Sequence, residues 1–399
     1  MTPGEEPGFD AEELRAETSL GKSIGVAATL GLGMYLGGAL LPEIRADLGV
    51  DLSAGALVVS LPWGTFVVGA LLAPVAAQAI GVHRTIGIAM LAAAGAIAVV
   101  AAQESLLLLL VGLTLFSALA TAGHVLGASI AADAVRRGRP NAIMLVSLAF
   151  AGGAFAAPLI SSLLLRTGGS WRLGYLIVLI SAIAIALPSL WREREAAAVE
   201  RVRGPGREAF RDPSVRRASV GLALYVGSEA TLTGWLVTIL RERGLSDMTS
   251  ATALSLFWSG IIAGRLLFVL LGRAAASDRH IACGASLGAV GFIVLTQIDV
   301  GGAGSMTIAL CTGLATAGLF PAILASGTAR ASAMEGAAAT AVAAGGIGGI
   351  AVPWIVGTAA DVVGFSLAMA LAALVPILLA VTFAIPSAEM SRRWRPGCS

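Results

Sequence analysis

The sequence carries little charge for its length. Only 13% of its 399 residues are Asp, Glu, Lys or Arg, about half of the roughly 25% that is usual in soluble domains. Hydrophobic residues make up 57% of the chain, and the mean hydropathy is +0.88. The composition therefore excludes a soluble globular enzyme and predicts a helical membrane protein.

The chain is also poor in residues that bind metals or act as nucleophiles. It has three Cys and three His, and Cys283, Cys311 and Cys398 do not have the spacing of a CxxC or Cys/His metal site. The sequence has no His-rich, paired-Asp or Ser/His/Asp set, and no Gly-x4-Gly-Lys-Ser/Thr phosphate loop. We therefore expect no metal, no cofactor, no enzymatic activity and no direct use of ATP.

Basic residues are dispersed rather than gathered on one face. The net charge is +2, and the Arg residues lie in short connections without interleaved aromatics, so we expect no nucleic-acid binding. The first 20 residues carry six acidic side chains, the opposite of the basic start of a secretory signal peptide. The first apolar segment is therefore expected to be retained.

Long apolar stretches fill most of the chain. A hydrocarbon core of about 30 Å needs about 20 apolar residues per helix, and stretches of that length predict twelve membrane spans. The spans cover residues 22–41, 54–80, 85–102, 105–132, 140–165, 172–190, 218–240, 250–272, 280–298, 304–329, 336–358 and 364–385.

An even number of spans places both termini on one side of the membrane. Twenty of the 26 Lys and Arg residues fall on that side, five on the other, and Arg265 lies within a span, so the positive-inside rule predicts that both termini are cytoplasmic. The expected organisation is an N-terminal cytoplasmic tail at 1–21, a six-helix bundle at 22–190, a cytoplasmic linker at 191–217, a second six-helix bundle at 218–385 and a C-terminal cytoplasmic tail at 386–399.

The two halves repeat one another at a fixed offset of 195 residues. The segment LATAG at 119–123 recurs at 314–318, and Trp63 and Trp258 are separated by the same offset. Further pairs at this offset are Gly49 and Gly244, Gly69 and Gly264, Arg84 and Arg279, and Pro158 and Pro353. Because six spans separate the copies, the halves have the same topology and are related by an axis along the membrane normal. This arrangement is typical of a two-bundle transporter with a central site.

The six-plus-six repeat with a basic central segment resembles the major facilitator superfamily over the whole chain. The loop PVAAQAIGVHR at 74–84 is similar to the family's Gly-x-x-x-Asp-x-x-Gly loop, with Pro in place of Gly and Gln in place of Asp. Glu229-x5-Trp235, FWSG at 257–260 and GRLL at 264–267 resemble the fucose-permease-like branch. The resemblance implies an all-α fold of twelve transmembrane helices and a secondary transporter that works by alternating access.

Two charged residues lie within the predicted spans, where a charge costs about 3 kcal/mol or more and tends to face a cavity or a partner. At 1.5 Å per residue, Glu229 lies about 16 Å and Arg265 about 10 Å from the inner ends of their spans. One hypothesis is that Glu229 binds and releases a proton while Arg265 is its charge partner or holds an anionic substrate group. The alternative is a static salt bridge between the two.

Other polar and aromatic residues complete the candidate site. His124 in span four is a proton relay or substrate donor, or else a neutral His bonded to a helix backbone. The resemblance implies that spans one, four, seven and ten line the cavity, and there helix packing is the alternative to substrate contact for each polar residue. These residues are Tyr35, Thr121, Tyr225, Thr233, Thr312 and Thr316. Trp63 and Trp258 are interpreted as a gate, or else as members of an interfacial aromatic belt.

These features predict a proton-coupled transporter of a small organic solute in the plasma membrane. Export is favoured over uptake, because span one has Met34 and Tyr35 where sugar–proton symporters of the fucose-permease type keep an acid. Proton-coupled uptake of a sugar or organic anion is the first alternative, and lipid flipping is the second. The expected partners are the solute, protons and membrane lipid. We expect a monomer.

Overall fold

The computed structural model describes residues 11–139, 141–190, 208–271, 277–328 and 336–385. Within these residues all regular structure is helical. Eleven helical stretches are long and apolar enough to cross a bilayer, two of which, at 301–327 and 365–384, each run over two consecutive helices. The count is twelve if α1 (Ala11–Ala39) and α2 (Leu41–Leu48), which meet at a bend of 58°, form one broken span. The predicted all-α membrane fold is confirmed.

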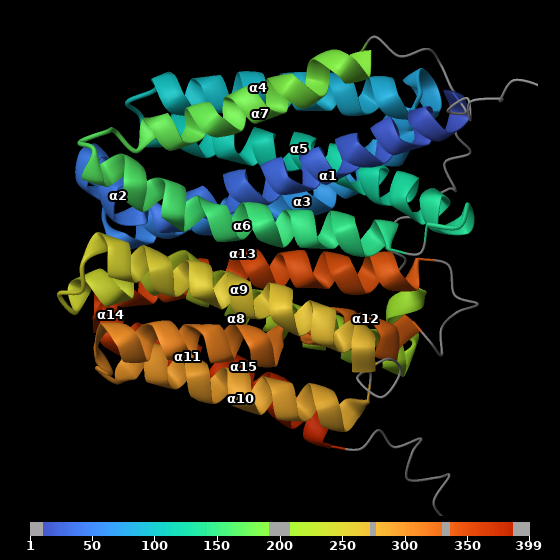
Figure 1. Ribbon diagram of the computed structural model, residues 1–399. Coiled ribbons are helices and arrows are strands. Elements are labelled where there is room, and N and C mark those ends of the chain that lie inside the picture. The colour runs from blue at the N-terminus through green and yellow to red at the C-terminus, as the bar shows by residue number, and fades with distance from the viewer. Residues whose placement is uncertain (1–10, 140, 191–207, 272–276, 329–335, 386–399) are drawn as a thin grey trace, which may run out of the picture.

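The helices form two bundles that lie side by side, one from each half of the chain (Figure 1). The first bundle holds α1, α2, α3 (Leu52–Ile80), α4 (Val82–Ala102), α5 (Leu106–Arg136), α6 (Ala142–Arg166) and α7 (Arg172–Leu190). The second holds the 3-10 helix η1 (Ala209–Arg211), α8 (Pro213–Glu242), α9 (Asp247–Leu271), α10 (Asp278–Gln297), α11 (Gly301–Thr316), α12 (Leu319–Thr328), α13 (Ala337–Val363), α14 (Phe365–Ala372) and α15 (Leu374–Ala384).

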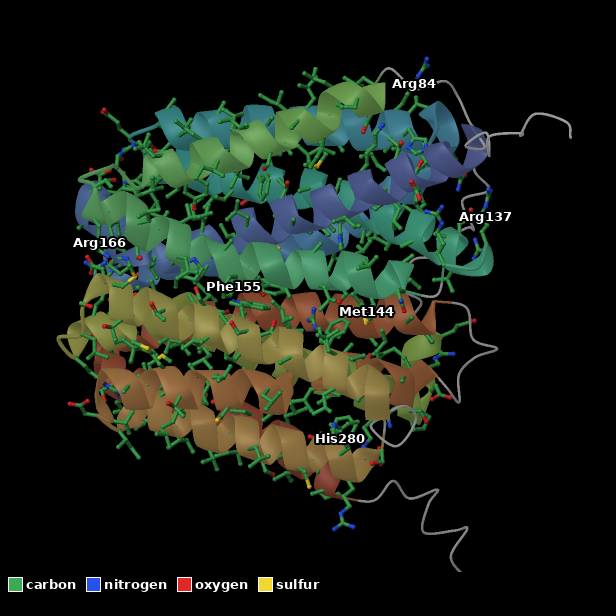
Figure 2. The ribbon with its side chains drawn as sticks, viewed as in Figure 1. Arg84, Arg137, Met144, Phe155, Arg166 and His280 are labelled. Carbon is green, nitrogen blue, oxygen red and sulfur yellow. The ribbon has the colours of Figure 1, made fainter. Side chains whose placement is uncertain are left out.

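The terminal side is the end where α1 begins and α15 ends, and the α2 side is the opposite end, at the left of Figure 1. Figure 2 shows Arg84, Arg137 and His280 on the terminal side and Arg166 on the α2 side. Phe155 lies between these two sides, beside the junction of the two bundles.

The packing of the helices repeats at the offset found in the sequence. A Cβ atom on Gly153 of α6 would lie 2.1 Å from the backbone oxygen of Ala28 in α1. A Cβ atom on Gly348 of α13 would lie 2.0 Å from the backbone oxygen of Ala223 in α8. Both members of the second contact are 195 residues after those of the first, so the same close approach of small residues is built twice.

Two helices begin well before the predicted spans, whereas the other early starts differ by at most three residues. Residues 11–21, expected in a tail, belong to α1, because Ala, Glu, Leu and Arg are strong helix formers and the helix continues through the single Gly21. Helix α8 begins at Pro213 rather than at 218, because the Asp212 carboxylate accepts hydrogen bonds from the N–H groups of Ser214 and Val215 at 2.7 and 3.2 Å. Linker residues 191–207 and tail residues 386–399 lie outside the described part of the chain.

Predicted spans ten and twelve are each broken into two helices. Proline has no N–H group and cannot bond to the residue four positions earlier. For Pro321 that residue is Ala317, between α11 and α12, and for Pro376 it is Ala372, the last residue of α14. The first-bundle counterpart of Pro321 is Leu126, and α5 runs through it unbroken. The break after α11 is therefore specific to the second bundle.

Candidate functional site

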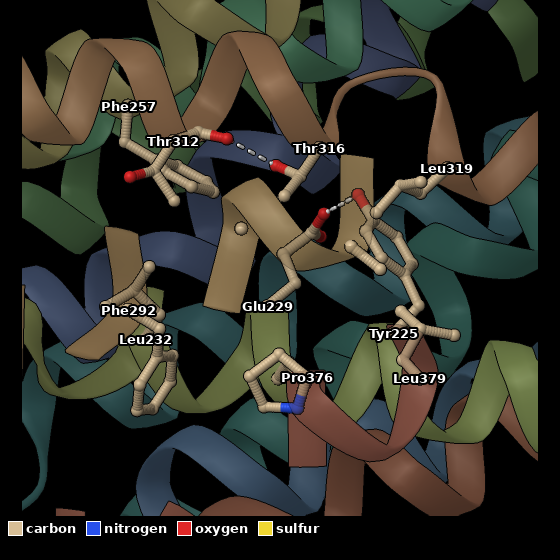
Figure 3. A pocket seen from close by; sticks show the side chains of 13 residues that line it. Tyr225, Glu229, Leu232, Phe257, Phe292, Thr312, Thr316, Leu319, Pro376 and Leu379 are labelled. Atoms are coloured by element: carbon tan, nitrogen blue, oxygen red, sulfur yellow. Dashed lines mark hydrogen bonds between the residues drawn. The ribbon is translucent and has the colours of Figure 1, made fainter. Parts of the chain in front are cut away.

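Glu229 lies in the middle of α8, half-buried, and two tyrosines hold its carboxylate. Tyr225, one turn earlier on the same helix, donates a short hydrogen bond to Oε2 (Figure 3). Tyr35 of α1 donates to Oε1 at 3.5 Å. Both tyrosine side chains are buried. The carboxylate is thus bonded from its own bundle and from the other one.

A cavity lies beside Glu229 within the second bundle (Figure 3). Its free volume is about 30 Å³, room for about two water molecules, so the cavity must widen before it admits an organic solute. The wall is mainly apolar and includes Phe257 and Phe292. Its polar members are Tyr225, Ser228, Glu229, Thr312 and Thr316. An apolar wall with a few convergent polar groups is the usual composition of a small-molecule site.

The three Ser and Thr hydroxyl groups of the cavity wall all donate their protons to backbone oxygens of their own helices. Ser228 donates to the backbone oxygen of Leu224 at 2.7 Å. Thr312 donates to that of Ile308 at 2.6 Å, and Thr316 to that of Thr312 at 2.9 Å. A hydroxyl that donates in this way keeps its lone pairs for a ligand. The cavity therefore offers hydrogen-bond acceptors.

Arg265 bonds to the first bundle rather than to Glu229. Its Nη1 donates to the backbone oxygen and Oγ of Ser147 in α6, at 3.3 and 3.1 Å. Ion pairs between described residues do not include one between Glu229 and Arg265. The static salt bridge considered from the sequence is therefore not formed in this conformation, and Arg265 links α9 to α6 across the two bundles.

Trp63 and Trp258, related by the repeat, both pack against Tyr35. Their ring centroids lie 6.2 and 4.4 Å from that of Tyr35, in edge-on geometry. Trp258 is fully buried, and Trp63 of α3 reaches Gly349 of α13, where an added Cβ would lie 2.9 Å from the indole. Such positions between the bundles do not fit an aromatic belt facing lipid headgroups. The gate role of the two tryptophans stays a prediction.

Only some of the polar residues expected to contact the substrate line the cavity. Tyr225, Thr312 and Thr316 line the cavity, whereas Tyr35, Thr121 and Thr233 do not. Thr233 donates to the backbone oxygen of Glu229 at 2.7 Å. Thr121 is fully buried, with no hydrogen-bond partner for Oγ1 among the described residues.

His124 lies apart from the cavity, beside the aromatic group around Tyr35. Its ring centroid is 5.9 Å from that of Phe150, which in turn lies 6.1 Å from that of Tyr35. Its Nδ1 is buried and has no partner in the described part of the chain. The backbone bond considered for His124 is therefore not made by this nitrogen.

Ser228 was missed in the sequence, although the helical period could have found it. Tyr225, Ser228, Glu229 and Leu232 follow the i, i+3, i+4, i+7 spacing of one helix face, and all four line the cavity. The cavity-lining residues of α10 and α15 follow no pattern that marks them in the sequence, because they are small or apolar. They include Ala285, Gly288, Pro376 and Leu379.

Comparison with known proteins gives relatives of sequence and of fold. The family model of the Major Facilitator Superfamily matches residues 24–353. Two glucose/galactose transporters, of Brucella abortus biovar 1 (strain 9-941) and Brucella abortus (strain 2308), are each 30% identical over 210 residues. That region covers 50% of this chain and 47% of each relative, so the chain spans about half the length of the curated relatives it matches.

The fold is similar to that of a solved bacterial homolog of the human lysosomal transporter Spinster. Its inward-facing and occupied conformation matches with a TM-score of 0.74 at 15% identity, over 99% of this chain and 100% of that one. Its inward-facing and unoccupied conformation matches with a TM-score of 0.71, at the same identity and coverage. With the family match over residues 24–353 and the two repeated bundles, the chain belongs to the major facilitator superfamily.

Proposed function

We propose that this protein carries a small hydroxylated organic solute across the plasma membrane by alternating access, with both termini in the cytoplasm. The observation that carries the proposal is the position of Glu229. It borders the cavity of the second bundle and bonds to Tyr35 of the first. A group placed between two bundles experiences a different environment whenever the bundles change their relative position.

The chemistry of the cavity favours a solute rich in hydrogen-bond donors. Ser228, Thr312 and Thr316 present acceptor lone pairs, and an ionised Glu229 accepts only. Sugar hydroxyls supply such donors, and the two curated relatives are named glucose/galactose transporters. The lack of an acid in span one was an argument against a sugar. That argument is weakened because Glu229 reaches Tyr35 of α1 from the other bundle.

The depth of Glu229 in the membrane supports the proposal that it couples transport to protons. Charged side chains within membrane helices are costly and mark ion and substrate pathways, and Glu229 is half-buried at mid-helix. A proton that binds Glu229 on one side and leaves on the other would link solute movement to the pH gradient. The same geometry serves uptake or export, and the preference for export stays a prediction.

Transport by proteoliposomes under an imposed pH gradient tests the proposal. Wild-type protein is expected to accumulate labelled glucose, galactose or a related polyol, whereas Glu229→Gln loses accumulation and keeps counterflow exchange. Glu242→Gln is the matched control, because Glu242 ends the same helix outside the cavity. Accumulation by Glu229→Gln at the wild-type level would contradict the role of Glu229. Failure of the wild type to move any hydroxylated solute would contradict the substrate class.

A further inference from the structure

The two hydrogen bonds to Glu229 differ in what they connect. Tyr225 and Glu229 are both on α8, so their bond is unaffected by relative motion of the bundles. Tyr35 is on α1, and among the described residues it is the member of the first bundle that hydrogen-bonds this carboxylate. The bond from Tyr35 therefore crosses the surface at which the bundles must move.

Tyr35 has little freedom to follow Glu229 by itself. Its side chain is 5% exposed, and its ring is packed edge-on against Trp63, Phe150 and Trp258. Edge-on aromatic pairs at these distances are favourable and orient the ring. A relative displacement of α1 and α8 at this level must therefore stretch or break the Tyr35–Glu229 hydrogen bond.

Helices α1 and α8 are in direct contact one turn further along. A Cβ atom on Gly38 would lie 2.9 Å from Cα of Gly234 and 3.0 Å from the backbone oxygen of Thr233. The two backbones therefore approach as closely as small residues allow. The Tyr35–Glu229 bond lies beside the point where the first helices of the two bundles touch.

Few other polar groups compete for the Glu229 carboxylate. Tyr225 faces it from α8, Tyr35 from α1, and Arg265 acts on it electrostatically from α9. The cavity residues contributed by α10, α11, α12 and α15 are uncharged. A hydrogen bond to an ionised carboxylate is roughly twice as strong as one between neutral groups. The strength of the Tyr35 bond therefore depends on whether Glu229 carries a proton.

We infer that Tyr35 is the positioning residue that transmits the protonation of Glu229 to the contact between the two bundles. With Glu229 ionised, the Tyr35 hydroxyl donates to the carboxylate and holds α1 against α8. When a proton binds a carboxylate oxygen, Tyr35 keeps its own proton, the bond loses its ionic strengthening, and α1 is released from α8. This inference rests on the proposed function and assigns the residue that would make transport depend on the proton.

The variant that tests this is Tyr35→Phe, which keeps the ring among Trp63, Phe150 and Trp258 and removes only the hydroxyl. We expect counterflow exchange to stay within about threefold of wild type, gradient-driven accumulation to be lost, and the pH dependence of exchange to flatten. Tyr175→Phe is the matched control. It removes a buried tyrosine hydroxyl in α7 that has no hydrogen-bond partner among the described residues and does not line the cavity, so it is expected to retain accumulation.

A distance measurement supplies a second readout. Spin labels on α1 and α8 are expected to report a separation that changes between pH 8 and pH 5 in the wild type and stays constant in Tyr35→Phe. If Tyr35→Phe fails to fold, replacement of Tyr35 by 3-fluorotyrosine keeps the ring and strengthens the donor. The midpoint of the distance change should then move to lower pH, and an unmoved midpoint would contradict the inference.

The outcomes separate this inference from the proposed function. If Glu229→Gln accumulates solute like the wild type, the proposed coupling itself is wrong. If Glu229→Gln is uncoupled while Tyr35→Phe accumulates normally, only the role of Tyr35 is wrong. Equal loss of accumulation in Tyr35→Phe and Tyr175→Phe would also overturn it, because the effect would then belong to the loss of a buried tyrosine hydroxyl and not to the contact between bundles.

Discussion

Asp361, in the last turn of α13, accepts a hydrogen bond from the backbone N–H of Ser53 at the start of α3, at 2.9 Å. Its other carboxylate oxygen accepts from the N–H of Leu52 at 3.3 Å. The first N–H groups of a helix lack partners within the helix and attract negative charge. Here the second bundle supplies that charge to a helix of the first.

A second contact closes the same side of the molecule. Arg241 near the end of α8 forms an ion pair with Glu43 of α2, and Arg241 also pairs with Asp247 at 3.0 Å. The Glu43–Arg241 pair, like the cap made by Asp361, joins the two bundles on the α2 side. The proposed alternating access requires this side to open, so both contacts are expected to break during a transport cycle.

Removal of the Asp361 cap is expected to favour opening of the α2 side. Loss of a helix cap costs about 1 kcal/mol, which changes a two-state population by a factor of about five. A suitable reporter is Val59→Cys, because Val59 is 7% exposed and packs against Gly234 of α8. In a background lacking the native cysteines, Asp361→Ala should raise the rate of maleimide labelling at position 59 about fivefold.

Asp299→Ala is the control for this experiment. Asp299 accepts a hydrogen bond from the N–H of Gly301, the first residue of α11, at 3.0 Å, so this contact lies within the second bundle on the α2 side. Its removal is expected to leave labelling at position 59 unchanged. Equal labelling in Asp361→Ala and the wild type would show that the Asp361 contact does not hold this side closed.

The sequence predicts the height of Glu229 in the membrane but not its partner. Apolar length and a rise of 1.5 Å per residue give depth along a helix, and depth alone allows Arg265 on the neighbouring span as a partner. Which face of α8 meets which face of α1 is decided by packing between bundles. Tyr35 is 194 residues away, and no local pattern identifies it as the hydroxyl that bonds to Glu229.

Features that depend on a single helix or on the repeat could be predicted from the sequence. The 195-residue offset predicts two similar bundles, and the contacts of Gly153 and Gly348 follow it. Asp361 lies beyond the predicted span 336–358, where a solvated loop residue would be expected. Its contact with Ser53 joins helices of two different bundles, so it cannot be predicted from the sequence of a single span.

Alanine at Gly153 or Gly348 is expected to destabilise the protein. An added Cβ would lie 2.1 or 2.0 Å from a backbone oxygen of the neighbouring helix, and the helices must separate to accommodate it. Overpacking of this kind typically costs about 1–3 kcal/mol. Each substitution should lower the Tm of the purified protein by several degrees, and by similar amounts because the two contacts are repeats.

Gly152→Ala is the matched control, one residue away on the same helix. A Cβ atom there would have no other atom within 4 Å, and Ala is a better helix former than Gly by up to about 1 kcal/mol. The Tm of this variant should equal or exceed that of the wild type. A decrease as large as that of Gly153→Ala would show that helix contact is not the cause.

The cap that Asp51 makes on α3 gives a prediction about pH. Its Oδ1 accepts hydrogen bonds from the N–H of Ala54 at 2.8 Å and from the hydroxyl of Ser53 at 3.0 Å. These bonds, that from Ala54 most of all, lower the pKa of Asp51 below its usual value. An acid with a lowered pKa stabilises the fold fully above its unfolded pKa of about 3.9, and this contribution is lost as the pH falls through the folded value.

Thermal unfolding of Asp51→Asn, which keeps an acceptor oxygen and removes the charge, tests this sign. The wild type should have the higher Tm by a constant amount from pH 8 to pH 5, because Asp51 is ionised in both folded and unfolded chains over that range. Below about pH 4 the two Tm values should converge, since protonation removes the charge from the wild type as well. A difference that already changes between pH 8 and pH 5 would mean that Asp51 is not held ionised by the cap.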